Sequence, residues 1–443
     1  MNGNTDLLLI GEVFVDFTLP NATSESKLRL GGIVHAARGL WAVDQSFAVA
    51  AVCPAYLIEN AKKYLEHLGC TEFIWLAEVK GSPNLMAIGD PTEIADQGYQ
   101  DILRDEKSVR FLEHIADVKK FKKCLIFPGK FDLLFVADLI SDDAEISFDI
   151  AYDLPETKLL VSFKGRIRAL ITSTSSNLFL ENAATDVSHL IDNLRSFSPA
   201  CVLLKENRGG SRLFDLVNDT VDEFPALLGE TVNSVGVGDV YSAVFVSLIE
   251  GSMQVAGWKA ARAATCYAQT TFPDDFKRDV VRSLTLSIDQ MRGLGGTFVP
   301  WHDRPKFQIY FAAPDFTYVD RTFVDQALEA LAYHNFNVRR PVLENGELKN
   351  GSNVDEMHTM FTADIALLKE CDFVFALPLT RDPGTLVEMG WAMATDVPVI
   401  SYDPLRENTN TMVIAGSKTY SDNLDTCLND LFEAMSKLRA SQQ

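Results

Sequence analysis

Short apolar runs that alternate with amphipathic helical stretches constrain the fold of this chain more than any other feature of its sequence. Strand-like runs are predicted at seven places: Leu7 to Phe17, Phe47 to Val52, Phe73 to Leu76, Leu133 to Ala137, Ile146 to Ile150, Ala169 to Ile171 and Cys201 to Leu204. Helical periodicity lies between several of them, and a long helical region follows from Asp239 to about Leu286. This order predicts an α/β domain on a mainly parallel sheet.

The segment MRGLGGTFVPWHDRPK, residues 291–306, interrupts this periodicity, and its Gly and Pro content indicates a linker. A second pattern follows, with strands in FQIYFAA, CDFVFALPL and VPVISYD and helices from Tyr318 to His334 and in GTLVEMGWAMA. Five elements in about 100 residues predict a small doubly wound domain. Since 443 residues exceed the usual span of one core, we expect one domain over 1–290 and another over 307–443.

The charge balance limits the partners of the chain. Sixty-one acidic and 40 basic residues give a formal net charge of −21, which repels polyanions. We therefore expect no nucleic-acid polymer as a partner. Single nucleotides stay possible, because a few backbone N–H groups at a helix terminus can hold one phosphate.

The seven cysteines are scattered and never form a C-x-x-C pair, which is typical of reduced thiols in a cytosolic protein. The start, MNGNTDLLLIGEVFVDF, lacks the basic and long apolar regions of a signal peptide. No run of 18 apolar residues occurs. We expect a cytoplasmic protein without a membrane partner.

Two carboxylates mark the second domain. The segment from Asp372 to Ala394 reads as strand, loop TRDPG and helix, with Asp382 in the loop and Glu388 on the second helical turn. Ligands of open α/β sheets bind at such loops. Paired carboxylates suit glycosidic chemistry, in which one attacks the anomeric carbon and a second group handles the proton of the leaving base. The alternative is a surface Glu388 and an Asp382 that only caps the helix.

Residues 307 to about 415 resemble the nucleoside 2-deoxyribosyltransferase family and its nucleotide N-glycosidase relatives. The resemblance rests on FQIYFAAPDF, on Asp364 and on the core D-P-G-T-x-x-E-x-G-x-A. It implies that Glu388 is the nucleophile and that Asp382 and Asp364 contact base and sugar. The other residues assigned to the substrate on this basis are Tyr310, Gly384, Thr385, Asn410 and Met412.

Asn410 and Met412, in NTNTM, match a segment that reaches a neighbouring subunit's site in the transferases, which implies a homo-oligomer, dimer or higher. The glycosidic reaction itself implies no cofactor. Whether water or a second base resolves the intermediate stays open. For a 5′-monophosphate, the N–H groups of Gly384 and Thr385 could hold the phosphate. Arg339 and Arg340 could also do so, or they are simply solvated.

The first domain has its own candidate phosphate site. The sequence NSVGVGD, residues 233–239, precedes an apolar helix, and its glycines let N–H groups approach a phosphate. Asp239 at the helix start could take a proton from a sugar hydroxyl. A tight turn with an aspartate cap is the alternative.

Residues 1 to about 290 resemble the PfkB, or ribokinase-like, family. The matching segments occur in the family order: LLLIGEVFVDF, LGGIVHAARGLWAV, FDIAYD, LLKENRGG and VGVGDVYSAVFV. The resemblance implies a ribokinase-like fold, ATP and Mg²⁺, Asp239 as the base, and an anion hole of Gly236, Val237 and Gly238. It places Asp16, Gly31 and Gly32 near the sugar.

Three departures bear on kinase activity. His35 stands where the family usually has asparagine, and either contacts a ligand or is structural. The N-x-x-E segment is eroded in STSSNLFLE, and the usual D-T-T reads Val232-Asn233-Ser234. No protein metal site is predicted.

The leading hypothesis is therefore a two-domain enzyme of nucleoside or nucleotide metabolism. Its second domain would cleave or transfer the N-glycosidic bond, and its first would phosphorylate a nucleoside or pentose. The alternative makes the first domain a degenerate kinase fold that senses a nucleoside and controls the glycosidase. A purely structural protein would require both acidic constellations to be accidental.

Overall fold

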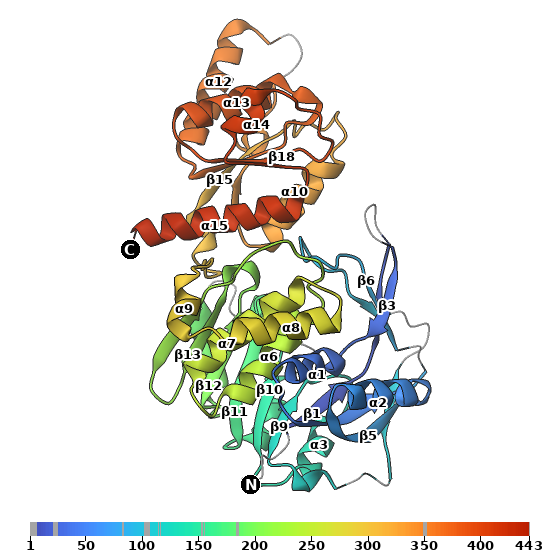
Figure 1. Cartoon of the computed structure of the whole chain (residues 1–443). Helices are drawn as coiled ribbons and strands as arrows, with labels where there is room; N and C mark the ends of the chain where they lie inside the picture. The colour runs from blue at the N-terminus through green and yellow to red at the C-terminus, as the bar shows by residue number, and fades with distance from the viewer. Residues whose placement is uncertain are drawn as a thin grey trace. The chain divides into compact units, whose positions relative to one another are not determined.

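The computed structural model describes residues 7–20, 25–81, 84–101, 107–113, 115, 117–151, 154, 156–182, 186–348 and 352–442. The first six residues of the chain and the last two of FDIAYD, which the sequence analysis used, lie outside this part. The chain divides into two units: Met1–Thr92 with Gln97–Phe298, and Glu93–Asp96 with Val299–Gln443 (Figure 1). Both units combine helices with sheets, which confirms the predicted α/β class.

The described residues of the N-terminal unit build a 10-stranded sheet. Its spatial order is β14 (Thr220–Phe224), β13 (Ser211–Asp215), β12 (Cys201–Lys205), β11 (Ile167–Ser173), β10 (Glu145–Asp149), β9 (Lys123–Ile126), β1 (Leu7–Glu12), β4 (Phe47–Cys53), β5 (Cys70–Lys80) and β8 (Ser108–Phe111). The strands from β12 to β5 pair in parallel, and β13, β14 and β8 add antiparallel edges. Apolar runs buried on both faces are typical of such parallel strands.

A smaller four-stranded sheet stands beside the large one, with the order β3 (Lys27–Leu30), β2 (Val15–Thr18), β6 (Leu85–Ile88) and β7 (Gln100–Asp101). The single strand expected from Leu7 to Phe17 is wrong. Strand β1 ends at Glu12, and β2, which begins at Val15, belongs to this second sheet. Asp16 therefore lies on β2, where it is buried.

Nine α-helices are described in the N-terminal unit. They are α1 (Ile33–Ala42), α2 (Ile58–His67), α3 (Leu133–Leu139), α4 (Asn177–Asn182), α5 (Val187–Arg195), α6 (Val237–Leu248), α7 (Met253–Ala268), α8 (Pro273–Leu284) and α9 (Ile288–Gly293). One core cluster joins α6, α7 and α8 to β11, β12 and β13, and another joins α1 and α2 to β1 and β4. Helices α1, α6, α7 and α8 lie together in Figure 1.

The strand predicted from Leu133 to Ala137 is wrong: this segment is helix α3. Asp132 caps it, since its carboxylate accepts hydrogen bonds from the backbone N–H groups of Leu134 at 2.8 Å and Phe135 at 3.4 Å. The periodicity of a short apolar run fits a helix and a strand equally well, so here the aspartate cap favours the helix.

The C-terminal unit holds a parallel five-stranded sheet in its described part, ordered β16 (Asn337–Arg339), β15 (Gln308–Ala312), β17 (Phe373–Ala376), β18 (Val399–Tyr402) and β19 (Thr419–Ser421). Its helices are α10 (Thr322–Tyr333), α11 (Pro341–Glu344), α12 (Val354–Lys369), α13 (Pro383–Ala394), α14 (Thr411–Gly416) and α15 (Leu424–Gln442). The doubly wound prediction is confirmed. The order reverses between β15 and its neighbours, which is where ligands bind in such sheets.

Two boundaries differ from the sequence pattern. The helix expected from Tyr318 begins only at Thr322, whose backbone N–H donates to the Asp320 carboxylate at 2.9 Å. Within the segment 291–306, Met291 packs in the N-terminal core and Arg304 is fully buried in the C-terminal unit. The segment is thus folded into its neighbours, and the two units divide after Phe298.

All seven cysteines are buried as free thiols. None of the helices in the described part of the chain combines the length and the apolar character needed to cross a bilayer.

Candidate active site

Helix α13 positions Glu388. The helix starts at Pro383, where the missing N–H costs nothing. Asp382 caps it: one carboxylate oxygen accepts from the Thr385 backbone N–H at 2.8 Å and from the Thr385 hydroxyl at 3.0 Å. Gly384 is exposed in the first turn, whereas Thr385 is buried. The capping role that the sequence left as an alternative is therefore real, and it fixes the first turn below Glu388.

Tyr310 on the central strand β15 meets Glu388. Its hydroxyl donates to Glu388 Oε1 over 2.6 Å, although the two residues are 78 positions apart in the chain. Burial raises the pKa of Glu388 to about 7, the Tyr310 hydrogen bond opposes this, and the negative charges of Asp364 and Asp382 add to the rise. Burial and the Glu388 carboxylate also raise the pKa of Tyr310, so its proton stays in place as a donor.

Asp364 joins this group from helix α12. Its Oδ1 accepts a hydrogen bond from Asn345 Nδ2 at 2.8 Å, and burial raises the pKa of its carboxyl group. Because its charge acts on both Glu388 and Tyr310, the three side chains gather at one place. The charges of Asp364 and Asp382 both act on Glu388. Negative charge near this carboxyl group disfavours its ionisation and favours a developing positive charge beside it.

The loop before α13 has a strained backbone and is hydrogen-bonded to residues that follow β18. Thr380 and Arg381 both have φ near 53°, a conformation that costs non-glycine residues free energy. Glu407 holds both of them, since its carboxylate accepts from the Thr380 N–H at 2.6 Å and its carbonyl from Arg381 Nε at 2.9 Å. Asn408 donates to the Pro378 carbonyl at 2.9 Å. Sequence reasoning missed Glu407 and Asn408, whose only signal was their place after a strand end.

Asn410 and Met412 lie at the start of α14. The Asn410 side chain caps this short helix by accepting from the Met412 N–H at 2.8 Å, and Met412 is 77% exposed. Among the described residues of this unit, neither Asn410 nor Met412 forms a hydrogen bond with Glu388.

The two neighbouring arginines are not simply solvated. Arg339 forms a two-pronged ion pair with Glu344, at 2.6 to 3.0 Å. Arg340 binds the buried carboxylate of Asp315 at 2.7 Å, and Arg321 pairs with the other oxygen of that carboxylate. Both arginines therefore have carboxylate partners, which weakens their case as phosphate ligands.

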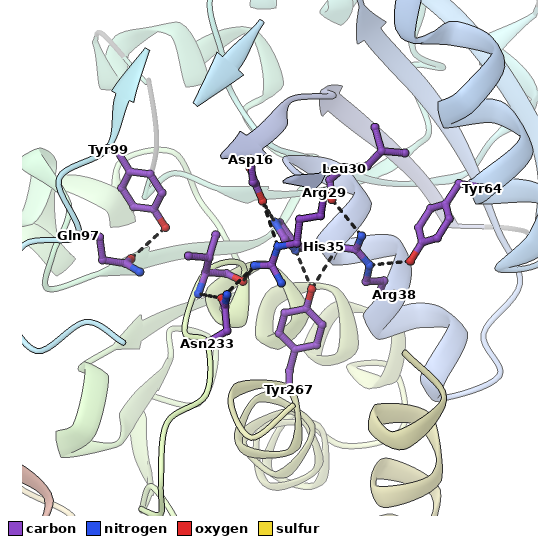
Figure 2. Close-up of polar contacts among 11 residues, drawn as sticks. Asp16, Arg29, Leu30, His35, Arg38, Tyr64, Gln97, Tyr99, Asn233 and Tyr267 are labelled. Carbon is purple, nitrogen blue, oxygen red and sulfur yellow. Dashed lines mark hydrogen bonds and ion pairs between the residues drawn. The ribbon is translucent and has the colours of Figure 1, made fainter. Parts of the chain in front are cut away.

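In the N-terminal unit, Asp16 and His35 meet near the start of α1 (Figure 2), and Gly31 lies against Asp16. The Asp16 carboxylate packs against Gly31, where an added Cβ would lie 2.0 Å from its oxygen. It accepts from His35 Nε2 at 2.8 Å, and His35 Nδ1 lies 2.7 Å from the Tyr267 hydroxyl. Burial lowers the pKa of His35 to about 4, against the opposing pull of Asp16, so the ring is neutral near pH 7. Gly32 begins the helix at φ 60°.

Arg29 from β3 ties this cluster to the glycine turn. Its guanidinium donates to Asn233 Oδ1 and to the Val235 carbonyl, both at 2.9 Å, and lies 3.5 Å from Asp16 (Figure 2). Gly236 has φ 83°, and an added Cβ there would collide with the His35 ring. The proposed sugar and phosphate residues are thus adjacent.

The start of α6 holds the other candidate residues. Asp239 is buried in the first turn, and the Val237 N–H donates to the Ser234 carbonyl at 3.1 Å. Lys205 Nζ binds the Gly238 carbonyl at 3.2 Å and the buried Asp149 carboxylate at 2.7 Å.

A lysine and a helix terminus at one place suit a phosphate group. For Mg²⁺ the donor set is poorer, since the described side chains contain no cluster of three or more His, Cys, Asp or Glu fit to hold a metal ion.

Comparison with known proteins gave three results. Residues 309–430 match the model of the nucleoside 2-deoxyribosyltransferase family, which confirms the resemblance of the C-terminal unit. No curated protein matches the sequence.

The chain is also similar in structure to three kinases over its N-terminal part. Ribokinase from Thermotoga maritima has 13% identity and a TM-score of 0.48, with 64% of this chain and 100% of that one covered. Adenosine kinase from Sinorhizobium meliloti has 14% identity and a TM-score of 0.48, covering 63% and 99%. Arabidopsis thaliana ribokinase complexed with ribose and ATP has 15% identity and a TM-score of 0.46, covering 64% and 99%.

Proposed function

We propose that the C-terminal unit, whose residues 309–430 match the nucleoside 2-deoxyribosyltransferase family, cleaves or transfers the N-glycosidic bond of a nucleoside or its 5′-monophosphate. The observation that carries this proposal is the half-buried Glu388 carboxylate, hydrogen-bonded to Tyr310 at 2.6 Å and acted on by the charges of Asp364 and Asp382. A carboxylate held in this way is a suitable nucleophile at an anomeric carbon.

In the proposed reaction, a Glu388 oxygen attacks the anomeric carbon while the bond to the base nitrogen breaks, and its electrons leave with the base, which takes up a proton. The Tyr310 hydrogen bond fixes the carboxylate and stabilises its ionised form. Asp364 and Asp382 contact base and sugar, and their charge stabilises the oxocarbenium-like transition state. Water or a second base then attacks the anomeric carbon and frees Glu388.

Chromatographic detection of free base tests this proposal. Wild type and Glu388→Gln are incubated with a panel of nucleosides and 5′-monophosphates, with and without a second base, ATP and Mg²⁺. Wild type should release base, and the variant should lose at least ~10³-fold in rate, since the nucleophile is gone. Glu329→Gln, an exposed position on α10, is the matched control and should keep wild-type activity. Equal base release by Glu388→Gln would rule out the nucleophile.

For the N-terminal unit we propose phosphorylation of a nucleoside or pentose with ATP. Asp239 would take the proton of the attacking hydroxyl, the start of α6 from Gly236 to Gly238 would hold the transferred phosphoryl group, and Lys205 would balance its charge. ATP with Mg²⁺ would supply the phosphoryl group. Asp16, which lies against Gly31, would bind the sugar together with Gly31 and Gly32. ATP consumption in the presence of pentoses or nucleosides, lost in Asp239→Asn, is the expected result.

One observation favours the alternative, a nucleoside-sensing unit without kinase activity: Asp16 is already engaged by His35 and Arg29. A sugar hydroxyl would have to compete with both for this carboxylate. Ligand binding without ATP turnover, together with base release that Asp239→Asn leaves unchanged, would select the sensor over the kinase.

A further inference from the structure

A cavity of about 280 Å³ opens in the N-terminal unit between helices α1, α2, α7 and α8. Its walls are aromatic and apolar apart from two arginines and two threonines: Arg29, Leu30, Arg38, Tyr64, Tyr267, Thr270, Thr271, Phe272, Pro273 and Phe276. None of these residues was assigned above to the sugar or to the phosphoryl group. Six of them lie on α7, on α8 or between these two helices, which carry none of the residues proposed for the reactions.

Arg38 is the unusual member of this wall. It is only 6% exposed, and arginine is rarely buried without an acidic partner. Its guanidinium donates to the Tyr64 hydroxyl at 2.9 Å, the Leu30 carbonyl at 3.0 Å and the Tyr267 hydroxyl at 3.2 Å, and lies 3.0 Å from His35 Nδ1 (Figure 2). None of these four partners is a carboxylate.

Arg29 adds a second positive charge on the same wall. Its nearest described carboxylate is Asp16 at 3.5 Å, which also accepts from His35. The cluster thus holds two guanidinium groups against one carboxylate, inside a chain whose net charge is −21. A surplus positive charge that is mostly withdrawn from water is stabilised when an anion binds beside it.

The volume of the cavity and its aromatic lining indicate the uncharged part of the ligand. A cavity of about 150 Å³ lined by apolar side chains is known to hold one benzene molecule. The larger volume here therefore accommodates one ring together with an attached anionic group. Tyr64, Tyr267, Phe272 and Phe276 offer faces and edges for stacking, and Phe272, 69% exposed, stands where the ring would enter.

We propose that this cavity binds a small ligand that joins a phosphate or carboxylate group to a flat apolar ring, with the anion between Arg29 and Arg38 and the ring among the aromatic side chains. The site belongs to the N-terminal unit and does not depend on the function proposed for the C-terminal unit. Because Arg38 and Arg29 both contact residues around Asp16, an anion bound there would compete with Asp16 for Arg29.

Calorimetric titration of the full chain with phenyl phosphate tests the proposal, with benzoate as the carboxylate probe and phenol and inorganic phosphate as the two halves of the first probe. Phenyl phosphate or benzoate should bind at least ~10-fold more tightly than phenol, and phenyl phosphate more tightly than inorganic phosphate. Arg38→Gln and Arg29→Gln should each weaken binding by about 10-fold or more, because a charge-assisted hydrogen bond is lost. Arg278→Gln, an exposed arginine of α8 that pairs with Asp275, is the matched control.

Since Arg38 is buried, Arg38→Gln could fail to fold, and circular dichroism must accompany it. In that case Arg29→Gln and Phe272→Ala still test the proposal. The side chain of Arg29 is 20% exposed and Phe272 lies at the cavity mouth, so we expect both variants to fold. Phenol binding as tightly as phenyl phosphate, inorganic phosphate binding as tightly as either aromatic anion, or affinity unchanged in Arg29→Gln and Phe272→Ala would overturn the proposal.

Discussion

The carboxyl group of Glu388 is subject to two opposing effects. As the proposed nucleophile it must be ionised, yet burial raises its pKa to about 7. Tyr310 is the neighbour that lowers the pKa, through a hydrogen bond to the ionised form. Near neutral pH the group is therefore divided between its two forms, and base release should rise with pH through this range.

Removing the Tyr310 hydroxyl should expose this balance. In Tyr310→Phe the pKa of Glu388 should rise further, so the acidic limb of the pH profile of kcat/KM should move to higher pH by about one unit. Tyr318→Phe, at a 73% exposed position, is the control and should leave the profile in place. A lower rate with an unmoved profile would assign Tyr310 a purely structural role.

The same pKa predicts a pH-dependent effect on stability. The folded state holds the Glu388 proton more tightly than the unfolded state, so this contribution is full below the unfolded pKa of 4.5 and is lost as pH rises through about 7. Glu388→Gln should therefore match wild type at about pH 4 and exceed it by on the order of 2 kcal/mol at about pH 8.5. Urea unfolding at both pH values measures the difference; a gap that does not depend on pH would contradict it.

The sequence predicted much of this residue pattern and missed the contacts across long separations. Glu388 and Asp382 were proposed from their local spacing in a loop and a helix, and Asp364 from the family resemblance, and their roles stay predictions. Arg29 was not proposed, since its hydrogen bonds to Asn233 and Val235 span 204 and 206 positions and leave no trace in local pattern. Arg340 was interpreted as a phosphate ligand or a solvated residue, whereas it pairs with Asp315.

At the scale of elements, the end of a helix matters as much as its apolar face. Helix α13 starts with a proline and an aspartate cap that precede Glu388 in the chain, and α12 starts with a capping box of Asn353 and Glu356. Such caps are readable in a sequence when the following residues are periodic. They were decisive where the period was ambiguous, as at Asp132, whose cap makes the segment from Leu133 a helix.

Two cap deletions separate stability from catalysis. Asp382→Ala and Asn353→Ala should each cost about 1 kcal/mol of unfolding free energy, since each leaves a helix start without its side-chain acceptor. Only Asp382→Ala should reduce base release, by at least ~10-fold, because only Asp382 lies near Glu388. Denaturant unfolding and base-release rates on both variants make the comparison; equal activity would reduce Asp382 to a cap.

At the scale of the whole molecule, the alternation of strands and helices predicted two α/β units, and the topology of each follows from parallel pairing. The Gly and Pro content of 291–306 predicted a linker, and the two units divide inside this segment, after Phe298. The sequence pattern did not predict that Met291 and Arg304 are buried in different units. Gly and Pro in a short segment predict turns. Whether the neighbouring side chains are buried depends on which distant parts of the chain pack against them.

Assembly is the remaining prediction at this scale. We expect a homo-oligomer in which Asn410 and Met412 of one chain reach the site of another, because Met412 is 77% exposed and Ile414 on the same short helix is 38% exposed. Met412→Glu should shift light scattering toward the monomer and lower base release together. Val217→Glu, at a 72% exposed position of the N-terminal unit, should change neither. A monomeric wild type with full activity would refute the shared site.

The buried thiols give the chain built-in reporters of its own opening. Cys53, Cys70, Cys124, Cys201 and Cys266 lie in the N-terminal unit, and Cys371 and Cys427 in the C-terminal one. A thiol shielded by packing reacts with an alkylating reagent only when the surrounding structure opens. Pulse alkylation followed by peptide mass spectrometry would therefore time the opening of each unit separately in the unmodified protein, and would show which one a bound ligand protects.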